Sequence, residues 1–484
     1  MKLVSLVFAI AMTVQLNCVS RCEGQTGIKV KVNNRGLRFV TDVVKTMAQS
    51  YVTSNSNLGS YSGRYSSWVT ANYNFNNLRV TSFSFGNVGL TTSSPNVITL
   101  RIRSASFAMR GQWSVNYRVW FFTVDNDGSF TADASGVDLT LSMRVGRDQN
   151  GRPTISSTSS CSANIGDMNA RVSGSSLSFL YNILLRFNSN SVRNTFAARI
   201  CPTVKSAIQS QANSILRNLN VNYALTTTTS IDLALSRPPT TASNQITVFS
   251  RGRCFPTNNP SMTIPVTAEN LPEFQMTSSH MIRMIVGDYV INTFLYVQWV
   301  SGSWDFWFGQ DSLAGYVGFN FTTDTMAGFL PGFANFGRNR PLRFFVHPTE
   351  SPFARTTSEN VNITAKFDLV TFVVAENGSL NDALNISIAA SLTGNVTVEN
   401  GNLRGQISAL TTKSTVSSSK IGDLPVVLVD LIVNNIAQRL LPSVNNVSMT
   451  LQTLPLPSGF GVSNVFVNTV EHGLEIATDM THAG

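Results

Sequence analysis

Apolar residues recur along this chain at two spacings, which predict long strands and a few amphipathic helices. Apolar residues occupy every second position from Trp113 to Phe121, and this period of two is typical of a strand with one buried face. Asp125–Gly128 then predicts a hairpin turn, with a return strand from Phe130. A second hairpin is expected over residues 294–308, with a turn at Ser301–Ser303.

Four segments repeat apolar residues at helical spacing, two in each half of the chain. They run from Leu37 to Tyr51, from Ser176 to Leu219, from Thr323 to Phe336 and from Asp423 to Leu441. The last is expected to begin at its aspartate as the N-cap, with Pro425 in the first turn. Because each half holds strands and two helical segments, we expect an internal duplication and an α+β fold class.

The last of these helices is apolar around most of its circumference, so one apolar surface cannot cover it. Two interpretations follow. The helix packs in an ordinary core, or it packs on a sheet with one flank and lines a lipid cavity with the other.

The chain is expected to hold a signal peptide and two domains. Residues 1–24 contain a lysine followed by a mostly apolar run and end near small residues, a pattern typical of a secretory signal. Paired prolines mark a linker at residues 237–245, because proline breaks regular structure and favours an extended chain. The predicted domains are residues 25–236 and 246–484.

Six Asn-x-Ser/Thr sequons in the second half agree with export and predict a secreted glycoprotein. Their asparagines are Asn320, Asn362, Asn377, Asn385, Asn395 and Asn446.

Positive charge is concentrated in the first half. Residues 25–236 hold 20 lysines and arginines against 8 acidic residues, a net charge of +12, whereas residues 237–484 hold 13 against 17, a net charge of −4. An anionic partner is therefore expected to meet the first half, although a solvated basic surface explains the charge equally well.

Five cysteines are present, and only two of them form an obvious internal pair. Cys18 lies in the expected signal peptide, Cys22 lies at its edge, and Cys254 stands alone. Cys161 and Cys201 bracket a helical stretch and are the best candidates for a structural disulfide, which would tie a helix end to a β-segment.

The sequence favours a protein without catalytic chemistry. The four histidines lack metal-ligand spacing, and there is no Gly-x-Ser-x-Gly elbow, P-loop or dinucleotide fingerprint. We therefore expect no catalytic residue, cofactor, metal ion or nucleic-acid partner.

Several short motifs in a shared order resemble the bactericidal/permeability-increasing protein and lipopolysaccharide-binding protein family. With the cysteine spacing, the resemblance covers nearly the whole mature chain. The motifs are Gly27–Val32 with Arg35–Leu37, Gly151–Ile155, Ile200–Pro202, Arg237–Thr241, His280–Met284, Gly287–Thr293 and Lys420–Pro425.

The resemblance implies an elongated boomerang of two similar domains, each a twisted antiparallel β-barrel with packed amphipathic helices, joined by a central β-sheet. It also implies an apolar pocket for acyl chains in each domain and a disulfide between Cys161 and Cys201. Bactericidal members of this family bind lipid A through a cationic tip on the first domain, whereas other relatives carry lipids between lipoproteins.

On this basis we expect an innate-immunity protein that binds bacterial lipopolysaccharide, phospholipid and the bacterial outer membrane surface. The strand that carries several lysines in bactericidal members keeps only Arg110 and Arg118 here, and Arg101 and Arg103 on a preceding strand would extend the patch. The four arginines are the expected head-group contacts. The expected pocket residues are Val40, Val43, Met47, Leu180 and Leu184 in the first domain and Val427, Leu431 and Ile432 in the second.

The aromatic residues near the expected tip have two interpretations. They are mostly core or sheet-face residues, or some insert at a membrane interface, where Trp and Tyr are favoured. These residues are Trp113, Tyr117, Trp120, Phe121 and Phe122.

Two other functions stay open. The small number of basic residues on the strand that contains Arg110 and Arg118 favours a carrier of phospholipid or neutral lipid without an antibacterial role. A structural glycoprotein with filled pockets is the third interpretation.

Overall fold

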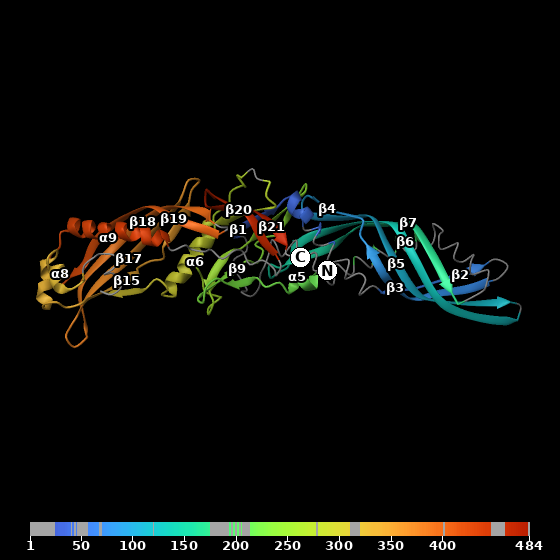
Figure 1. Ribbon diagram of the computed structural model, residues 1–484, viewed down its shortest axis with the longest axis horizontal. Coiled ribbons are helices and arrows are strands. Elements are labelled where there is room, and N and C mark those ends of the chain that lie inside the picture. Colours follow the sequence, from blue (N-terminus) through green and yellow to red (C-terminus); the bar gives the residue numbers. More distant parts are fainter. Residues whose placement is uncertain are drawn as a thin grey trace.

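The computed structural model describes most of the chain between residues 25 and 482. The described residues are 25–39, 41, 42, 45, 57–66, 70–119, 121–174, 193, 194, 197, 198, 201, 202, 205, 213–276, 279–309, 320–399, 402–446 and 460–482. The protein is elongated, with a first sheet at one end, a central sheet in the middle and a second sheet at the other end (Figure 1).

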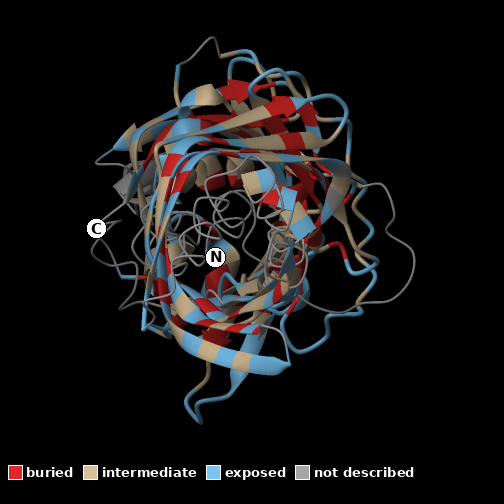
Figure 2. Cartoon of the chain, turned by 90° about the vertical axis from the view of Figure 1, so that its right-hand side faces the viewer, coloured by how far each residue is buried: buried red, intermediate tan, exposed pale blue. Residues whose placement is uncertain are grey.

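The first sheet has the strand order β2-β3-β5-β6-β7, with β4 paired to β5, and all its pairs are antiparallel. Buried and exposed residues alternate along strands that curve around the long axis (Figure 2). Its inner face packs Phe130 and Trp113 into one core. The strands are β2 (Asn57–Ser66), β3 (Thr70–Ser84), β4 (Asn87–Ser93), β5 (Val97–Val119), β6 (Phe122–Arg147) and β7 (Pro153–Ser173).

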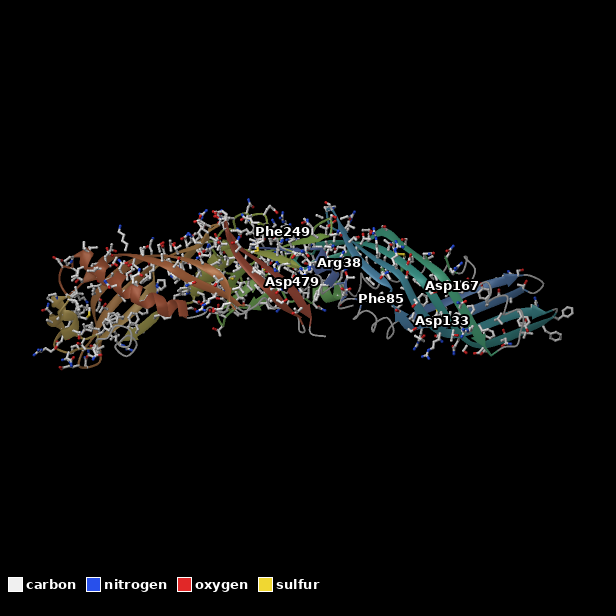
Figure 3. The ribbon with its side chains drawn as sticks, turned by 45° about the horizontal axis from the view of Figure 1, so that its top comes forward. Arg38, Phe85, Asp133, Asp167, Phe249 and Asp479 are labelled. Atoms are coloured by element: carbon white, nitrogen blue, oxygen red, sulfur yellow. A yellow bond between two sulfur atoms is a disulfide. The ribbon has the colours of Figure 1, made fainter. Side chains whose placement is uncertain are left out.

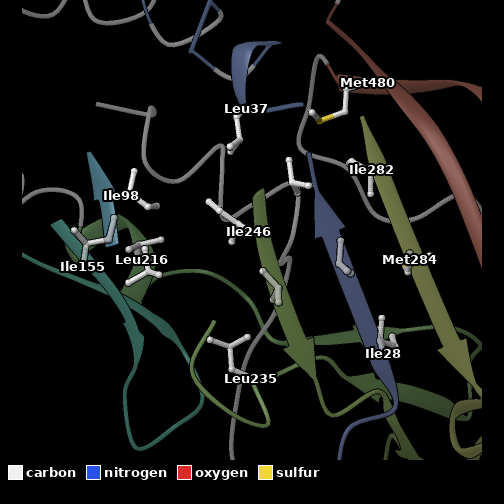
Figure 4. Close-up of a cluster of buried hydrophobic side chains, with 14 of the residues drawn as sticks. Ile28, Leu37, Ile98, Ile155, Leu216, Leu235, Ile246, Ile282, Met284 and Met480 are labelled. Carbon is white, nitrogen blue, oxygen red and sulfur yellow. The ribbon is translucent and has the colours of Figure 1, made fainter. Parts of the chain in front are cut away.

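The central sheet joins distant parts of the chain in the order β10-β11-β1-β13-β21-β20. β1 lies between β11 and β13, antiparallel to both, and its apolar side chains join the cluster in Figure 4. The expected linker, residues 237–245, contributes β10 to this sheet. The strands are β1 (Ile28–Val32), β10 (Thr240–Ala242), β11 (Gln245–Ser250), β13 (Ile282–Gly287), β20 (Phe460–Val470) and β21 (Gly473–His482).

The second sheet repeats the antiparallel design in the order β14-β15-β17-β18-β19, with β16 paired to β17. Within the strands that the structure describes, neither end sheet closes by pairing its first and last strands. The strands are β14 (Phe306–Gly309), β15 (Leu342–Pro348), β16 (Phe353–Thr356), β17 (Val361–Val374), β18 (Leu380–Glu399) and β19 (Asn402–Ser419).

A small sheet and a few helices complete the described fold, and the expected α+β class is confirmed. The small sheet has the order β12-β9-β8, α6 packs against β12 and β16, and α9 packs along β19. These elements are β8 (Asn222–Ala224), β9 (Thr229–Asp232), β12 (Arg253–Pro256), α5 (Asn213–Arg217), α6 (Asp288–Val300), α8 (Thr323–Ala327), the 3₁₀ helix η2 (Pro331–Phe336) and α9 (Val426–Asn446).

The expected turn at Asp125–Gly128 was wrong, because these residues lie inside β6. β5 and β6 are joined through residues 120 and 121, and Asn116 pairs with Asp125 in the register and donates a hydrogen bond to its carboxylate at 2.7 Å. Gly128 lies opposite Trp113, where a Cβ would clash with the Ser173 carbonyl oxygen and stand 2.8 Å from the indole nitrogen. The glycine therefore makes room for the backbone of β7 and for a buried indole ring, and it does not form a turn.

The expected strand over residues 294–300 was also wrong, since this segment is the second half of α6. Tyr289, Asn292 and Val297 are among its buried positions, and their spacing places them on the helix face that packs inward. A short apolar run is equally compatible with a strand and with a buried helix, and tertiary packing favours the helix here.

Two expected helices have different bounds. The segment 323–336 divides into α8 and η2, because Gly328 caps the first piece and Pro331 begins the second. α9 begins later than expected, since its first hydrogen bond of helical spacing runs from Val429 to the Pro425 carbonyl. Asp423 is therefore not the N-cap, and the helix continues to Asn446.

The first two expected helices are described only in part. Residues 34–39, 41, 42 and 45 are helical. The described residues between 193 and 205 are also helical, and residues 213–217 form α5. The expected signal peptide lies outside the described residues. Among the helices that the structure describes, none is both long and apolar enough to cross a membrane.

The structure contains the expected disulfide between Cys161 and Cys201. The two Cα atoms are 5.9 Å apart, and the bond ties β7 to a helical residue 40 positions later. It therefore links the first sheet to the segment that follows it.

Cys254 is a buried free thiol, and we expect it to resist alkylation in the folded protein. Burial raises the pKa of Cys254 to about 12, so almost no thiolate forms at pH 8. Mass spectrometry of the Cys254 peptide after iodoacetamide treatment should show an unmodified thiol in buffer and a modified thiol in guanidinium. Rapid modification in buffer would contradict this burial.

Candidate lipid-binding surface

The four arginines expected to contact lipid phosphates lie on one strand, β5, and not on two. Arg101, Arg103, Arg110 and Arg118 are all exposed. Odd and even positions of a regular strand face opposite sides, but the register of β5 against β6 shifts at Ser104, whose φ is 55°. This bulge puts all four arginines on the outer face.

The four arginines nevertheless do not form one site. A strand rises about 3.3 Å per residue, so Arg101 and Arg118 lie roughly 55 Å apart along β5. Arg103 is engaged elsewhere, since its guanidinium donates to the Asp138 carboxylate at 2.7 Å. The Ser104 amide and this arginine lower the pKa of Asp138.

A compact group of arginines runs across the strands instead. In the strand register, Arg79 on β3 pairs with Arg110 on β5. Arg110 also pairs with Thr131 on β6, and Thr131 pairs with Arg171 on β7. With about 4.8 Å between neighbouring strands, Arg79 and Arg171 lie roughly 14 Å apart on the outer face. We call Arg79, Arg110 and Arg171 the arginine row.

The arginine row is available to an anion. All three side chains are exposed, and none has a hydrogen bond or ion pair with the part of the chain that the structure describes. Asp133, two residues from Thr131 on β6, is the acidic residue close to the row, and Figure 3 places it on the first sheet. The local charge is therefore positive.

The sequence did not indicate two of the three residues of this row. Arg79 and Arg171 are single basic residues in polar strand segments that are 92 positions apart. Only the register of four strands brings them beside Arg110.

The outer end of the β5–β6 hairpin is aromatic and exposed. Phe121 and Phe122 are 88% and 75% exposed, whereas Trp113 and Tyr117 are buried in the sheet core. Trp120 lies outside the described residues. The tip therefore presents two phenyl rings to solvent beside the exposed Arg118.

α9 carries an uncovered apolar stripe in the second half. Val429 and Val433 pack into the core of the second sheet, whereas Val427 and Leu431, four residues apart, are 81% and 60% exposed. Ile432 is half-buried. The five pocket residues expected in the first domain lie outside the part of the chain whose side chains are described.

The sequons lie on strands, turns and a helix end of the second half. Asn320, Asn377 and Asn395 are exposed, and Asn362 and Asn385 are half-buried on β17 and β18. The side chain of the last sequon asparagine, at the end of α9, is not described.

The sequence of the chain matches the profiles of a known protein family. The sequence profile of the LBP / BPI / CETP family, C-terminal domain, matches residues 224–482, and that of the N-terminal domain matches residues 15–219. The chain belongs to the LBP / BPI / CETP family. It is thus a member of a lipid-binding family, and the resemblance noted from its motifs is confirmed.

Individual members of the LBP / BPI / CETP family are distant in sequence. Human lipopolysaccharide-binding protein is 24% identical over 75% of this chain and 74% of its own length. A bactericidal permeability-increasing protein from Sebastes schlegelii is 21% identical over 99% and 98%. Human phospholipid transfer protein is 26% identical over 40% of this chain and 38% of its own length.

The fold agrees with a solved structure of this family. The crystal structure of lipopolysaccharide binding protein superposes with a TM-score of 0.55 and 20% identity, covering 95% of this chain and 99% of that chain. At this identity the likeness shows the fold alone.

Proposed function

We propose that this protein is secreted and binds bacterial lipopolysaccharide through its lipid A, together with phospholipid, in defence against Gram-negative bacteria. The arginine row carries the proposal, because it sets on one outer face three guanidinium groups that have no partner among the described residues. Similarity to lipopolysaccharide-binding and bactericidal permeability-increasing proteins supports the same ligand class. The apolar start of the chain and the sequons support export.

The row suits a phosphorylated head group. The guanidinium fork donates two parallel hydrogen bonds to phosphate, and such charge-assisted bonds are stronger than neutral ones. Lipid A carries two phosphate groups on one disaccharide, so two of the three arginines can each meet one. Of the four arginines expected to contact the lipid phosphates, Arg110 is the one that we place in this contact.

Acyl chains would supply most of the affinity. Each buried methylene contributes about 0.8 kcal/mol, so a long chain binds tightly without any catalytic residue or cofactor. The exposed apolar stripe of α9 supports an acyl contact by Val427, Leu431 and Ile432. For the first domain we retain Val40, Val43, Met47, Leu180 and Leu184 as the proposed pocket.

A carrier of phospholipid without antibacterial action is the second candidate. Similarity to human phospholipid transfer protein favours it, as does the wide spacing of basic residues along β5. A carrier would depend on chain burial, which salt hardly changes, whereas head-group recognition weakens as screening increases.

The aromatic tip gives a test of membrane contact. Replacing Phe121 and Phe122 by serine should weaken binding to lipid A aggregates about tenfold, because each exposed phenyl ring gains burial on insertion. The control replaces Phe306 and Phe329, which are also exposed, at 56% each, but lie in the second half. Cosedimentation with aggregates measures both. Equal losses in the two double variants would exclude a special role of the tip.

A further inference from the structure

A cavity of about 500 Å³ lies in the second half, outside the surfaces described above. Its walls come from α6, the segment 265–271, the residues around β16 and the turn between β20 and β21. Small-molecule sites commonly have volumes of 300–1,000 Å³, so a ligand of modest size fits.

One face of α6 forms an ordered aromatic wall of this cavity. Asp288 and Asn292 fasten the helix to β16: the carboxylate accepts from the Thr356 hydroxyl at 2.6 Å, and the Asn292 amide donates to the Ala354 carbonyl at 2.8 Å. Burial raises the pKa of Asp288, and the hydrogen bonds from Thr356 oppose this shift. The next positions of the same face are Tyr296 and Trp299.

The two rings on α6 are fixed relative to each other. The centroids of Tyr296 and Trp299 are 5.7 Å apart with the planes at 63°, and the indole N–H of Trp299 donates to the Pro348 carbonyl at 2.9 Å. Phe353, half exposed on β16, adds a third ring to the lining. With Tyr289, which also belongs to the lining, four aromatic residues from two elements surround one cavity.

Charged groups of both signs lie in the same lining. Glu269 and Glu350 are exposed carboxylates, paired with His472 at 2.9 Å and with Lys366 at 3.1 Å. Arg355 is exposed and has no hydrogen bond or ion pair within the described ranges of the chain. The cavity thus combines aromatic rings, carboxylates and one uncommitted guanidinium group.

We propose that this cavity binds a phosphocholine group, with the trimethylammonium against Tyr296, Trp299 and Phe353 and the phosphate on Arg355. A quaternary ammonium ion cannot donate a hydrogen bond, and aromatic faces attract it through their quadrupoles. The carboxylates of the lining add attraction for the cation, and the arginine fork suits the phosphate. The zwitterion matches the mixed charge of the lining.

This inference deepens the phospholipid part of the proposed function, on which it rests, and is independent of the lipid A part. Lipid A has no choline, and the arginine row lies on the first sheet, far along the molecule from α6 (Figure 1). Phosphocholine reaches the protein either as a free molecule or as the head group of phosphatidylcholine. Both present the same chemistry to the cavity.

Titration calorimetry of the full chain with phosphocholine and with choline tests the site. The double variant F353L/R355Q should weaken phosphocholine binding about tenfold. The matched double variant F329L/R343Q, which removes an equally exposed phenylalanine and an exposed arginine outside the lining, should bind as the parent does. Circular dichroism melts verify that both variants fold.

Single variants separate the two parts of the ligand. F353L should weaken choline and phosphocholine to the same extent, whereas R355Q should weaken phosphocholine alone, because choline has no phosphate. Absence of saturable phosphocholine binding by the parent would overturn the proposal, as would an equal loss in F329L/R343Q or an effect of R355Q on choline.

Competition identifies the source of the ligand. If phosphatidylcholine vesicles displace phosphocholine, the head group is the ligand; if vesicles do not compete, the free molecule is. Either result supports the site. Lipid A binding should be unchanged in F353L/R355Q, so failure of this site leaves the proposed recognition of lipid A untouched.

Discussion

Replacing Arg79, Arg110 and Arg171 together by glutamine is expected to weaken binding to lipid A aggregates about 30-fold at low salt. Exposed ion pairs contribute up to about 1 kcal/mol each, so the pairs with the two phosphates of lipid A together account for roughly 2 kcal/mol. The loss should shrink at high salt, because screening has already weakened the same contacts in the parent. Surface plasmon resonance on immobilised lipid A measures both conditions.

A second triple variant controls for total charge. Arg101, Arg118 and Arg144 are exposed arginines of the same sheet that lie outside the row. Arg118 is far along β5 from the other two, and Arg101 and Arg144 are four residues apart in the register of β5 and β6. Their replacement by glutamine removes the same charge but leaves the arginine row intact, so only a few-fold loss is expected. If this dispersed triple loses as much affinity as the row, binding follows net charge and the row has no special role.

Replacing Cys161 and Cys201 by serine is expected to lower the free energy of unfolding by about 2–4 kcal/mol. The bond closes a loop of 40 residues, and the chain-entropy estimate for such a loop is close to 4 kcal/mol. Denaturant titration followed by tryptophan fluorescence measures the change.

Reductant supplies the control for the disulfide. Dithiothreitol should lower the midpoint of the parent toward that of the double serine variant and leave the variant unchanged. An unfolding midpoint that is the same in parent and variant without reductant would show that the bond does not stabilise the fold.

The sequence predicted two strands of the first sheet, β5 and β6, from alternation but placed their connection wrongly. Asp125–Gly128 has the composition of a tight turn, yet the buried Trp113 needs a residue without a side chain opposite it, and Gly128 fills that position. The free energy of a local turn preference is small compared with that of burying an indole ring, so the strand pairing determines the structure here. α6 shows the same limit, since its second half reads equally well as a strand.

The candidate surface was less predictable than the fold. Arg110 is visible as a basic residue in a strand, but Arg79 and Arg171 become its neighbours only through pairing across four strands. The common outer face of Arg101 and Arg110 depends on the bulge at Ser104, which a simple alternation pattern cannot reveal.

Binding of the purified mature protein to lipid A aggregates and to phosphatidylcholine vesicles, each at low and high salt, tests the central claim most directly. We expect tight binding to lipid A that weakens steeply as salt rises, and weaker, salt-insensitive binding to the vesicles. Equal and salt-insensitive binding to both would contradict recognition of an anionic head group and would favour the carrier.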